Sequence, residues 1–575
     1  MMSRNQRFGW IATLVLVLSI SPLANASALW GQISRANNGK IALDLDTTKS
    51  EPVDVIVQFT AKPSQHHIDK VLSRGGKLKS QFHSVKGAVF TVSPRILSEL
   101  ANDPEVAFIS PDRKTKTHTS QYFDNYQNTI NTAYAWNLGF NGAGIGVAVI
   151  DSGILPNPDL GSRVVYNQSF VPGETSTTTD LYGHGTHVAG ILGGNGAQSS
   201  GSGYSLTIKG VAPSVNIVNL RVLDENGSGA DSTIIAAIDQ AMALKSTYNI
   251  RIINLSVGRG VYESYTQDPL CQAVEAAWQD GIVVVVAAGN DGRDNTYGEN
   301  GYGMIDAPGN DPYVLTVGAM NTNGTPSPAD DQIASYSSKG PTVVDQIVKP
   351  DVVAPGNQII SLCVPGSTLY DEEPTNVVPT STYQTSGTSA ASSAYFMLSG
   401  TSMATPAVAG TVALMLQQTP ALTPDQVKAR IMLTASKTLQ PYTSVFSAGF
   451  TYNSQSDIFT VGAGYLNVQA ALSSSALAPS TVGSAMSPSA TFSYSGSVQV
   501  VPATGSVLGS SSSTWSISSV WGTSVTLAGS SQLWGAAEAV WGNMAVEATS
   551  VLWGKSVVWG KSGAPDAGMA VLTGD

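Results

Sequence analysis

The chain has 575 residues, of which 42% are hydrophobic and 12% charged, and its formal net charge is -11. The hydrophobic share suffices for a sizeable core and argues against wholesale disorder. The acidic balance offers no basic surface for nucleic acid, and two cysteines exclude a disulfide scaffold and any four-cysteine metal site.

The N-terminus is typical of an export signal. Two arginines precede an apolar run over residues 8–20, Pro22 interrupts the run, and a small-x-small cleavage site follows at 24–26. A membrane anchor is the alternative, but the run has about 13 residues and a membrane-spanning helix needs about 20. We therefore expect a signal peptide over residues 1–26 and a secreted mature protein without a membrane span, whether extracellular, periplasmic or at the cell surface.

Residues 52–118 are predicted to form a small α+β domain. Strand-like alternation at 53–59 is followed by a helical stretch, two strands around Lys86-Gly87, a second helical stretch and a last strand at 106–110. This β-α-β-β-α-β order is the ferredoxin-like pattern. Residues 29–118 carry a net charge of +4 and the rest of the chain beyond them -17, so the two parts can attract each other.

Between residues 120 and 472, short apolar runs alternate with helical stretches. The runs cover 145–150, 215–222, 251–257, 282–288 and 313–317. Near-continuous Val and Ile runs indicate strands covered on both faces, so we expect an α/β domain with a largely parallel, doubly wound sheet. In such sheets the functional residues follow the carboxyl ends of the strands.

The remainder of the chain is rich in Ser, Ala and Gly. Residues 473–513 are predicted to be a flexible linker. Over residues 514–563 an aliphatic-Trp-Gly unit recurs with a period of about six or seven residues, which is typical of hexapeptide β-helices. Exposed tryptophans would suit binding to a surface, a glycan or a partner that the sequence does not identify. A low-complexity extension without such a role is the alternative.

Three residue types of nucleophilic catalysis occur in separate motifs. His184 and His187 are the only histidines after residue 118, so any imidazole base of this body must be one of them. Asp151 ends an apolar strand, where a sheet edge can hold a carboxylate in a fixed orientation. Ser402 opens an Ala-rich helix, whose N-terminal dipole favours a negative oxygen. Each residue alone has a structural explanation, as a turn histidine, a strand-end aspartate or an N-cap serine.

Taken together, the motifs at 151–153, 184–190 and 400–406 resemble the three signatures of the subtilisin-like serine proteases, in the same chain order. The similarity covers roughly residues 120–472. It implies Ser402 as the nucleophile, His184 as general base and then acid, and Asp151 as the group that orients the imidazole. His187 would be structural.

The resemblance also implies how a peptide is bound. Asn290 would donate its side-chain amide to the oxyanion, beside the backbone N–H of Ser402. Substrate would lie as an added strand between Ser228-Gly229 and Ser256-Val257-Gly258. The walls of the first specificity pocket would be Ser256, Val257, Gly258, Ala287, Ala288 and Gly289. Because both walls are small and uncharged, we expect a broad endopeptidase with a preference for apolar or aromatic side chains before the scissile bond.

The basic N-terminal domain resembles the propeptide of this family, an inhibitor and folding chaperone removed by self-cleavage between about residues 114 and 121. No cofactor is implied for catalysis, and Asp159 is a candidate ligand for a structural calcium ion. Partners would be protein or peptide substrates and the propeptide in cis. Gly387-Thr388-Ser389-Ala390 imitates the nucleophile motif without its continuation, within a predicted surface insertion over 366–396. Cys271 and Cys363 could pair, which their spacing does not test.

Two functions follow from these motifs. One is a secreted, self-processing serine endopeptidase. The other is a catalytically silent member of the family that binds a surface through its Trp-Gly tail. The complete set of Asp, His, Ser and Asn favours the enzyme.

Overall fold

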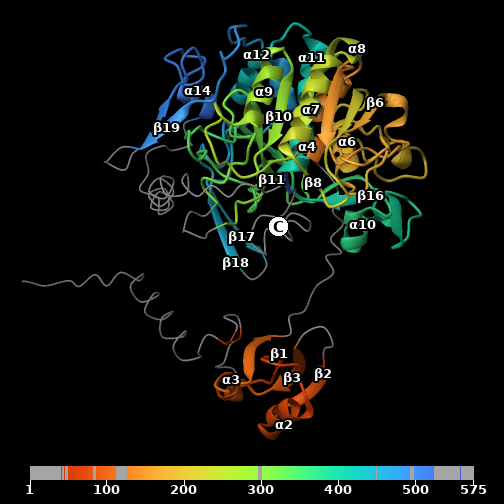
Figure 1. The fold of residues 1–575 in the computed structure, drawn as a ribbon, viewed down its shortest axis with the longest axis vertical. Coiled ribbons are helices and arrows are strands. Elements are labelled where there is room, and N and C mark those ends of the chain that lie inside the picture. The colour runs from red at the N-terminus through yellow and green to blue at the C-terminus, as the bar shows by residue number, and fades with distance from the viewer. Residues whose placement is uncertain are drawn as a thin grey trace, which may run out of the picture. The chain divides into compact units, whose positions relative to one another are not determined.

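The computed structural model describes residues 40–41, 45, 50–81, 86–111, 126–294, 301–447, 450–492, 498–522, 557–558 and 575. The chain divides into two compact units, residues 1–120 and 121–575, which are described separately (Figure 1). The predicted signal peptide and the predicted processing region lie outside the described residues, as does most of the Trp-Gly tail.

The N-terminal unit has the predicted ferredoxin-like order. Its elements are β1 Val53–Phe59, α2 Gln65–Ser73, β2 Lys77–Gln81, β3 Gly87–Val92, α3 Leu97–Ala101 and β4 Val106–Pro111. The antiparallel sheet has the strand order β2-β3-β1-β4. Val55, Val57 and Phe90 are fully buried in a core of its own, so alternate residues of β1 face the helices as the sequence predicts.

The second unit is built on an eight-stranded sheet. Its strands are β5 Gly146–Asp151, β6 Val164–Ser169, β7 Asn216–Arg221, β9 Ile250–Leu255, β10 Val283–Ala287, β11 Leu315–Asn321, β12 Gln332–Ile333 and β13 Val352–Pro355. The order is β12-β11-β10-β9-β5-β7-β6, with β13 pairing β11. Every pairing is parallel except β11 with β12, which confirms the predicted α/β fold with a largely parallel sheet.

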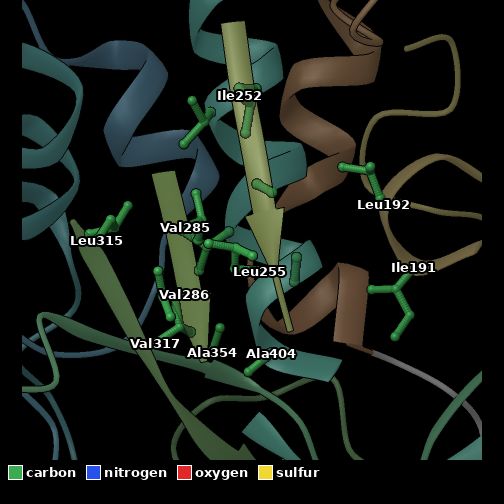
Figure 2. Close-up of a cluster of buried hydrophobic side chains, with 14 of the residues drawn as sticks. Ile191, Leu192, Ile252, Leu255, Val285, Val286, Leu315, Val317, Ala354 and Ala404 are labelled. Atoms are coloured by element: carbon green, nitrogen blue, oxygen red, sulfur yellow. The ribbon is translucent and has the colours of Figure 1, made fainter. Parts of the chain in front are cut away.

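Helices cover this sheet. The longer ones are α6 His184–Gly193, α7 Asp231–Ala243, α9 Pro269–Gln279, α11 Thr401–Gln418 and α12 Pro424–Thr434. Strands β5 and β10 are buried at every residue, which requires cover on both faces. Helices α6 and α11 pack against each other, as do α7 and α9. Figure 2 shows Ile191 of α6, Ala404 of α11, Leu255 of β9 and Val286 of β10 among the side chains of this core.

Smaller elements surround the main sheet. They are α4 Tyr126–Thr129, α5 Thr132–Asn137, β8 Ser228–Gly229, α8 Lys245–Tyr248, β14 Ile359–Leu362, α10 Thr368–Glu372, β15 Val377–Pro379, β16 Ala391–Leu398, β17 Tyr442–Ser447, β18 Phe450–Gln455, α13 Val468–Ser473, β19 Ser489–Phe492, β20 Val498–Val501, α14 Ile517–Trp521 and β21 Val557–Val558. The predicted insertion over 366–396 is folded, since β16 pairs with both β14 and β15. Each described helix falls short of the length and apolarity that a membrane-spanning helix requires.

The prediction of a flexible linker over residues 473–513 is wrong for its described part. Ala485 and Leu508 are buried in the main core, together with Trp515 and Trp521 from the start of the predicted tail. Ser487 accepts a hydrogen bond from Lys428 Nζ at 2.8 Å. A composition rich in Ser, Ala and Gly favours a flexible chain in isolation. Here the small side chains instead allow the backbone to pack closely against the domain.

Candidate active site

The candidate site lies at the carboxyl ends of three neighbouring strands. Ile150 of β5 is paired with Leu255 of β9, and Leu255 is paired with Val286 of β10. The residues that follow these positions therefore lie next to one another at one edge of the sheet. They include Asp151 at the end of β5, Ser256 after β9 and, a little further on, Asn290 after β10.

Asp151 and His184 form a buried pair. The Nδ1 atom of His184 lies 2.7 Å from Oδ1 of Asp151, and the side chains are 0% and 1% exposed. A carboxylate at Nδ1 favours a proton on that nitrogen, which directs the other ring nitrogen, Nε2, toward accepting a proton. The same oxygen of Asp151 accepts the backbone N–H of Ser152 at 2.7 Å, so the carboxylate is held in one orientation.

A second buried aspartate, which the sequence analysis did not single out, fixes the start of α6. Asp180 accepts hydrogen bonds from Gly183 N (2.7 Å) and Ser152 Oγ (2.8 Å) on Oδ1. Its Oδ2 accepts from the backbone N (2.8 Å) and Oγ1 (2.7 Å) of Thr186. Burial raises the pKa of Asp180, and the hydrogen bonds from Thr186, Gly183 and Ser152 oppose that rise. These bonds tie the histidine helix to the strand that carries Asp151.

Ser402 is the second residue of α11 and is fully buried. Its Oγ donates to the carbonyl oxygen of Ser256 at 3.0 Å, and Ser256 Oγ donates to the carbonyl of Ser402 at 3.0 Å. Pro406 has no N–H to offer the carbonyl four residues before it, which belongs to Ser402. The Ser256 hydroxyl supplies the missing donor, so α11 continues through its proline and remains attached to the end of β9.

Asn290 is oriented by the residue before the serine. Its Oδ1 accepts hydrogen bonds from the backbone N (2.9 Å) and Oγ1 (3.1 Å) of Thr401. Because Thr401 occupies the carbonyl end of the amide, the Nδ2 donors are directed away from Thr401. The sequence motifs indicate Asn290 but not Thr401, because the role of Thr401 depends on a contact between distant segments.

The predicted substrate-binding edge also lies beside the imidazole. A side chain at Gly227 would meet the ring of Tyr182 at 2.6 Å, and the Tyr182 and His184 rings are 6.5 Å apart. The strand β8 that follows, Ser228–Gly229, pairs with β21 in antiparallel register. The pairing with β21 indicates that the backbone groups of β8 can accept an added strand.

The two predicted walls of the specificity pocket meet at an unexpected residue. The walls themselves are as small as expected, with Val257 and Ala288 buried and glycines at 258 and 289. Between these glycines lies Asp306, whose Oδ2 is 2.7 Å from where a Cβ on Gly289 would be. The expectation of an uncharged pocket considered only the wall residues.

The arrangement around Asp159 does not fit a calcium site. Asp159 Oδ1 accepts from the backbone N of Gln198 at 2.7 Å, and Oδ2 accepts from the hydroxyl of Tyr395 at 2.9 Å. Within the described ranges, no three His, Cys, Asp or Glu side chains gather in a group that could hold a metal ion.

The remaining candidates have structural surroundings. His187 Nε2 contacts the carbonyl oxygens of Ile359 (3.2 Å) and Phe396 (3.1 Å), and burial lowers the pKa of His187 to about 3. This histidine stays neutral and joins α6 to the neighbouring sheet. Cys271 and Cys363 are both buried free thiols in this structure.

Comparisons with known proteins show the family of this chain. The model of the subtilase family matches residues 142–462. Serine protease AprX of Bacillus subtilis is 36% identical over 382 residues, 65% of this chain and 79% of that protein. Subtilisin E of Bacillus subtilis is 32% identical over 463 residues, 80% of this chain and 98% of that protein. An alkaline protease of Shouchella clausii is 31% identical over 360 residues. The chain belongs to the subtilase family and is a subtilisin-like serine protease.

Proposed function

We propose that the protein is a secreted serine endopeptidase that cleaves peptide bonds through an acyl-enzyme on Ser402. The observation that carries this proposal is the buried 2.7 Å pair of Asp151 and His184 at the strand ends, with Ser402 bonded to the adjacent strand end at Ser256. These residue types at one sheet edge are those that acyl transfer requires.

The chemistry follows from these positions. The Ser402 hydroxyl attacks the substrate carbonyl while its proton passes to Nε2 of His184, and Asp151 stabilises the resulting imidazolium without taking its proton. The tetrahedral oxyanion accepts hydrogen bonds from Asn290 Nδ2 and the backbone N–H of Ser402. His184 then protonates the leaving amine. In the second half of the reaction, water attacks the acyl group while His184 takes its proton, and His184 then returns a proton to the Ser402 oxygen as the acid product leaves.

Substrate recognition would rest mainly on backbone pairing. A peptide would add as a strand between β8 and residues 256–258, a mode that reads the main chain first and accepts many sequences. The sequence predicts a preference for apolar or aromatic side chains from the wall residues of the pocket alone. Asp306 lies between these walls and favours a different side chain. We propose no calcium ion at Asp159, since protein donors already bind both of its oxygens.

Activation by removal of the N-terminal unit is part of the proposal. This unit has a hydrophobic core of its own and the ferredoxin-like order of a compact domain. Its positive charge complements the acidic remainder of the chain. Both properties suit an inhibitor that folds independently and is then cleaved away.

Labelling with a fluorophosphonate probe tests the catalytic assignment. The wild type should be labelled, and Ser402→Ala should not be. Ser389→Ala is the matched control, because it alters the serine of the imitating Gly-Thr-Ser motif and should leave labelling unchanged. If folded and processed wild type takes up no label, the enzyme assignment fails and the silent surface-binding alternative is favoured.

A further inference from the structure

The main chain fixes Asp306 between the two predicted walls of the specificity pocket. Its N–H donates to the carbonyl of Ala288 at 3.0 Å, beyond the end of β10. The next residue, Ala307, exchanges two backbone hydrogen bonds with Arg259, at 2.7 and 3.0 Å. Three backbone bonds thus hold Asp306 against both walls, so its location is a property of the fold and not of a mobile loop.

The carboxylate occupies the space that glycines leave open. A Cβ at Gly258 would lie 2.9 Å from Cβ of Asp306, and a Cβ at Gly289 would lie 2.7 Å from its Oδ2. Distances below 3.0 Å are not tolerated between such atoms, so any side chain at Gly258 or Gly289 would displace Asp306. The absence of side chains on both walls therefore serves to place a carboxylate between them.

The carboxyl group of Asp306 has no ion-pair partner among the described residues. The charge of Arg259 acts on Asp306, but its guanidinium pairs with Asp231 at 2.8 Å and with Asp268 at 2.9 Å. Across the described parts of the chain, no lysine, arginine or histidine forms an ion pair with Asp306. Asp306 is nevertheless partly exposed, so a ligand can reach it.

The surroundings of Asp306 also favour binding of a cation. Burial raises the pKa of Asp306 well above its ordinary value, and the nearby carboxylate of Asp291 raises it further, while Arg259 opposes the rise. A carboxyl group in such surroundings gains stability when a cation approaches, because the cation offsets both the lost hydration and the repulsion from Asp291.

We propose that Asp306 forms the floor of the first specificity pocket and that the enzyme prefers lysine or arginine before the scissile bond. This inference rests on the proposed function, because it assumes that residues 256–258 and 287–289 contact that side chain. An ammonium or guanidinium group at the end of a long apolar stem would pass between the small walls and pair with the carboxylate. The sequence analysis predicted an apolar or aromatic preference, so the two predictions exclude each other.

Peptide substrates that differ only in the residue before the scissile bond test the proposal. With the processed wild type, kcat/KM should be higher for lysine and arginine than for phenylalanine and leucine. Asp306→Asn should lower kcat/KM for the basic substrates by about 100-fold and leave the apolar ones within a few-fold, since an amide cannot pair with a cation. Asp280→Asn is the matched control, because it removes the same charge from an exposed position at the end of α9 and should leave the preference unchanged.

The pH profile supplies a second measurement. Since the pKa of Asp306 is raised, this group is partly protonated at low pH and gains its charge as the pH rises. For lysine substrates KM should therefore fall with rising pH beyond the change that phenylalanine substrates show, and this difference should vanish in Asp306→Asn. The two charged groups that act on Asp306, Asp291 and Arg259, are unchanged in this comparison.

The possible failures are distinguishable. If the wild type is labelled by a fluorophosphonate but cleaves apolar substrates as well as basic ones, with no effect of Asp306→Asn, the specificity proposal is overturned while the proposed function stands. If the wild type is neither labelled nor active on any peptide, both are overturned. A variant that retains fluorophosphonate labelling is folded, so loss of basic substrates alone in Asp306→Asn is not a folding defect.

Discussion

At the scale of single residues, the site depends on side chains that hold other side chains. Asp180 binds the start of the histidine helix through three hydrogen bonds and Ser152, next to Asp151, through a fourth. Thr401 holds the carbonyl end of the Asn290 amide. Neither residue would touch substrate, yet each fixes a group that would. A donor aimed at the developing oxyanion stabilises the transition state only if its direction is set beforehand.

Thr401→Val tests this positioning role. The substitution keeps the size of the side chain and the backbone bond to Asn290. It removes the Oγ1 bond to Asn290 at 3.1 Å and the Oγ1 contacts with the backbone N (3.3 Å) and O (3.2 Å) of Gly289. We expect kcat to fall about tenfold with little change in KM, because the amide would be less well directed at the oxyanion.

Thr411→Val is the matched control, since Thr411 is also buried in α11 and donates within the helix to Ala407 at 2.9 Å. Equal kinetic effects of the two substitutions, or a change confined to KM, would show that Thr401 has no special relation to the oxyanion.

At the scale of elements, the segment after α13 is part of the domain. Helix α14 packs on α12, and Trp521 at its end is 1% exposed. Ser516 caps α14 by accepting a hydrogen bond from Ser519 N, and Gly522 follows with a positive φ of 81°. A capping serine and a terminal glycine are helix boundary signals even within a low-complexity region.

Truncation of Trp521 measures how strongly this segment is attached. In a Ser402→Ala background, which prevents self-digestion, Trp521→Ala should lower the free energy of unfolding by about 3–5 kcal/mol, through lost burial and a cavity. Chemical denaturation of the catalytic unit would measure the change.

Leu477→Ala provides the comparison, because Leu477 is 56% exposed. This substitution should lower the free energy of unfolding by no more than about 0.5 kcal/mol. If Trp521→Ala lowers the free energy of unfolding as little as Leu477→Ala does, residues 498–522 contribute little to the stability of the domain.

At the scale of the whole molecule, the chain combines a small basic unit with a large acidic one. The boundary between the two compact units falls at Ser120 and Gln121. This position lies within the region, about residues 114–121, where the sequence predicts processing. Two units with separate cores can fold and persist as separate bodies, as an inhibitory domain that is cleaved away must.

Self-cleavage predicts a specific product for an inactive variant. Ser402→Ala should retain residues 29–118, whereas the wild type should lose them, because only the active chain can cut its own linker. Intact mass and N-terminal sequencing of the secreted proteins would show this. Ser389→Ala should be processed like the wild type, and a fully processed Ser402→Ala protein would disprove self-cleavage.

The sequence alone determined the local and repetitive features of this protein. The period-two pattern of β1, the runs of β5, β9 and β10 that are rich in Val or Ile, and the motifs around Asp151, His184 and Ser402 each lie within a few consecutive residues. Such patterns are readable because the residues that create them are adjacent in the chain.

The tertiary structure decided everything that depends on contacts between distant segments. It placed Asp306 between Gly258 and Gly289. It supplied a protein hydrogen-bond donor to each carboxyl oxygen of Asp159. It also buried residues that the composition alone assigned to a linker. Composition and spacing describe what a segment can do by itself. What it does in the protein depends on which surface it meets, because burial and hydrogen bonding are supplied by residues far away in the sequence.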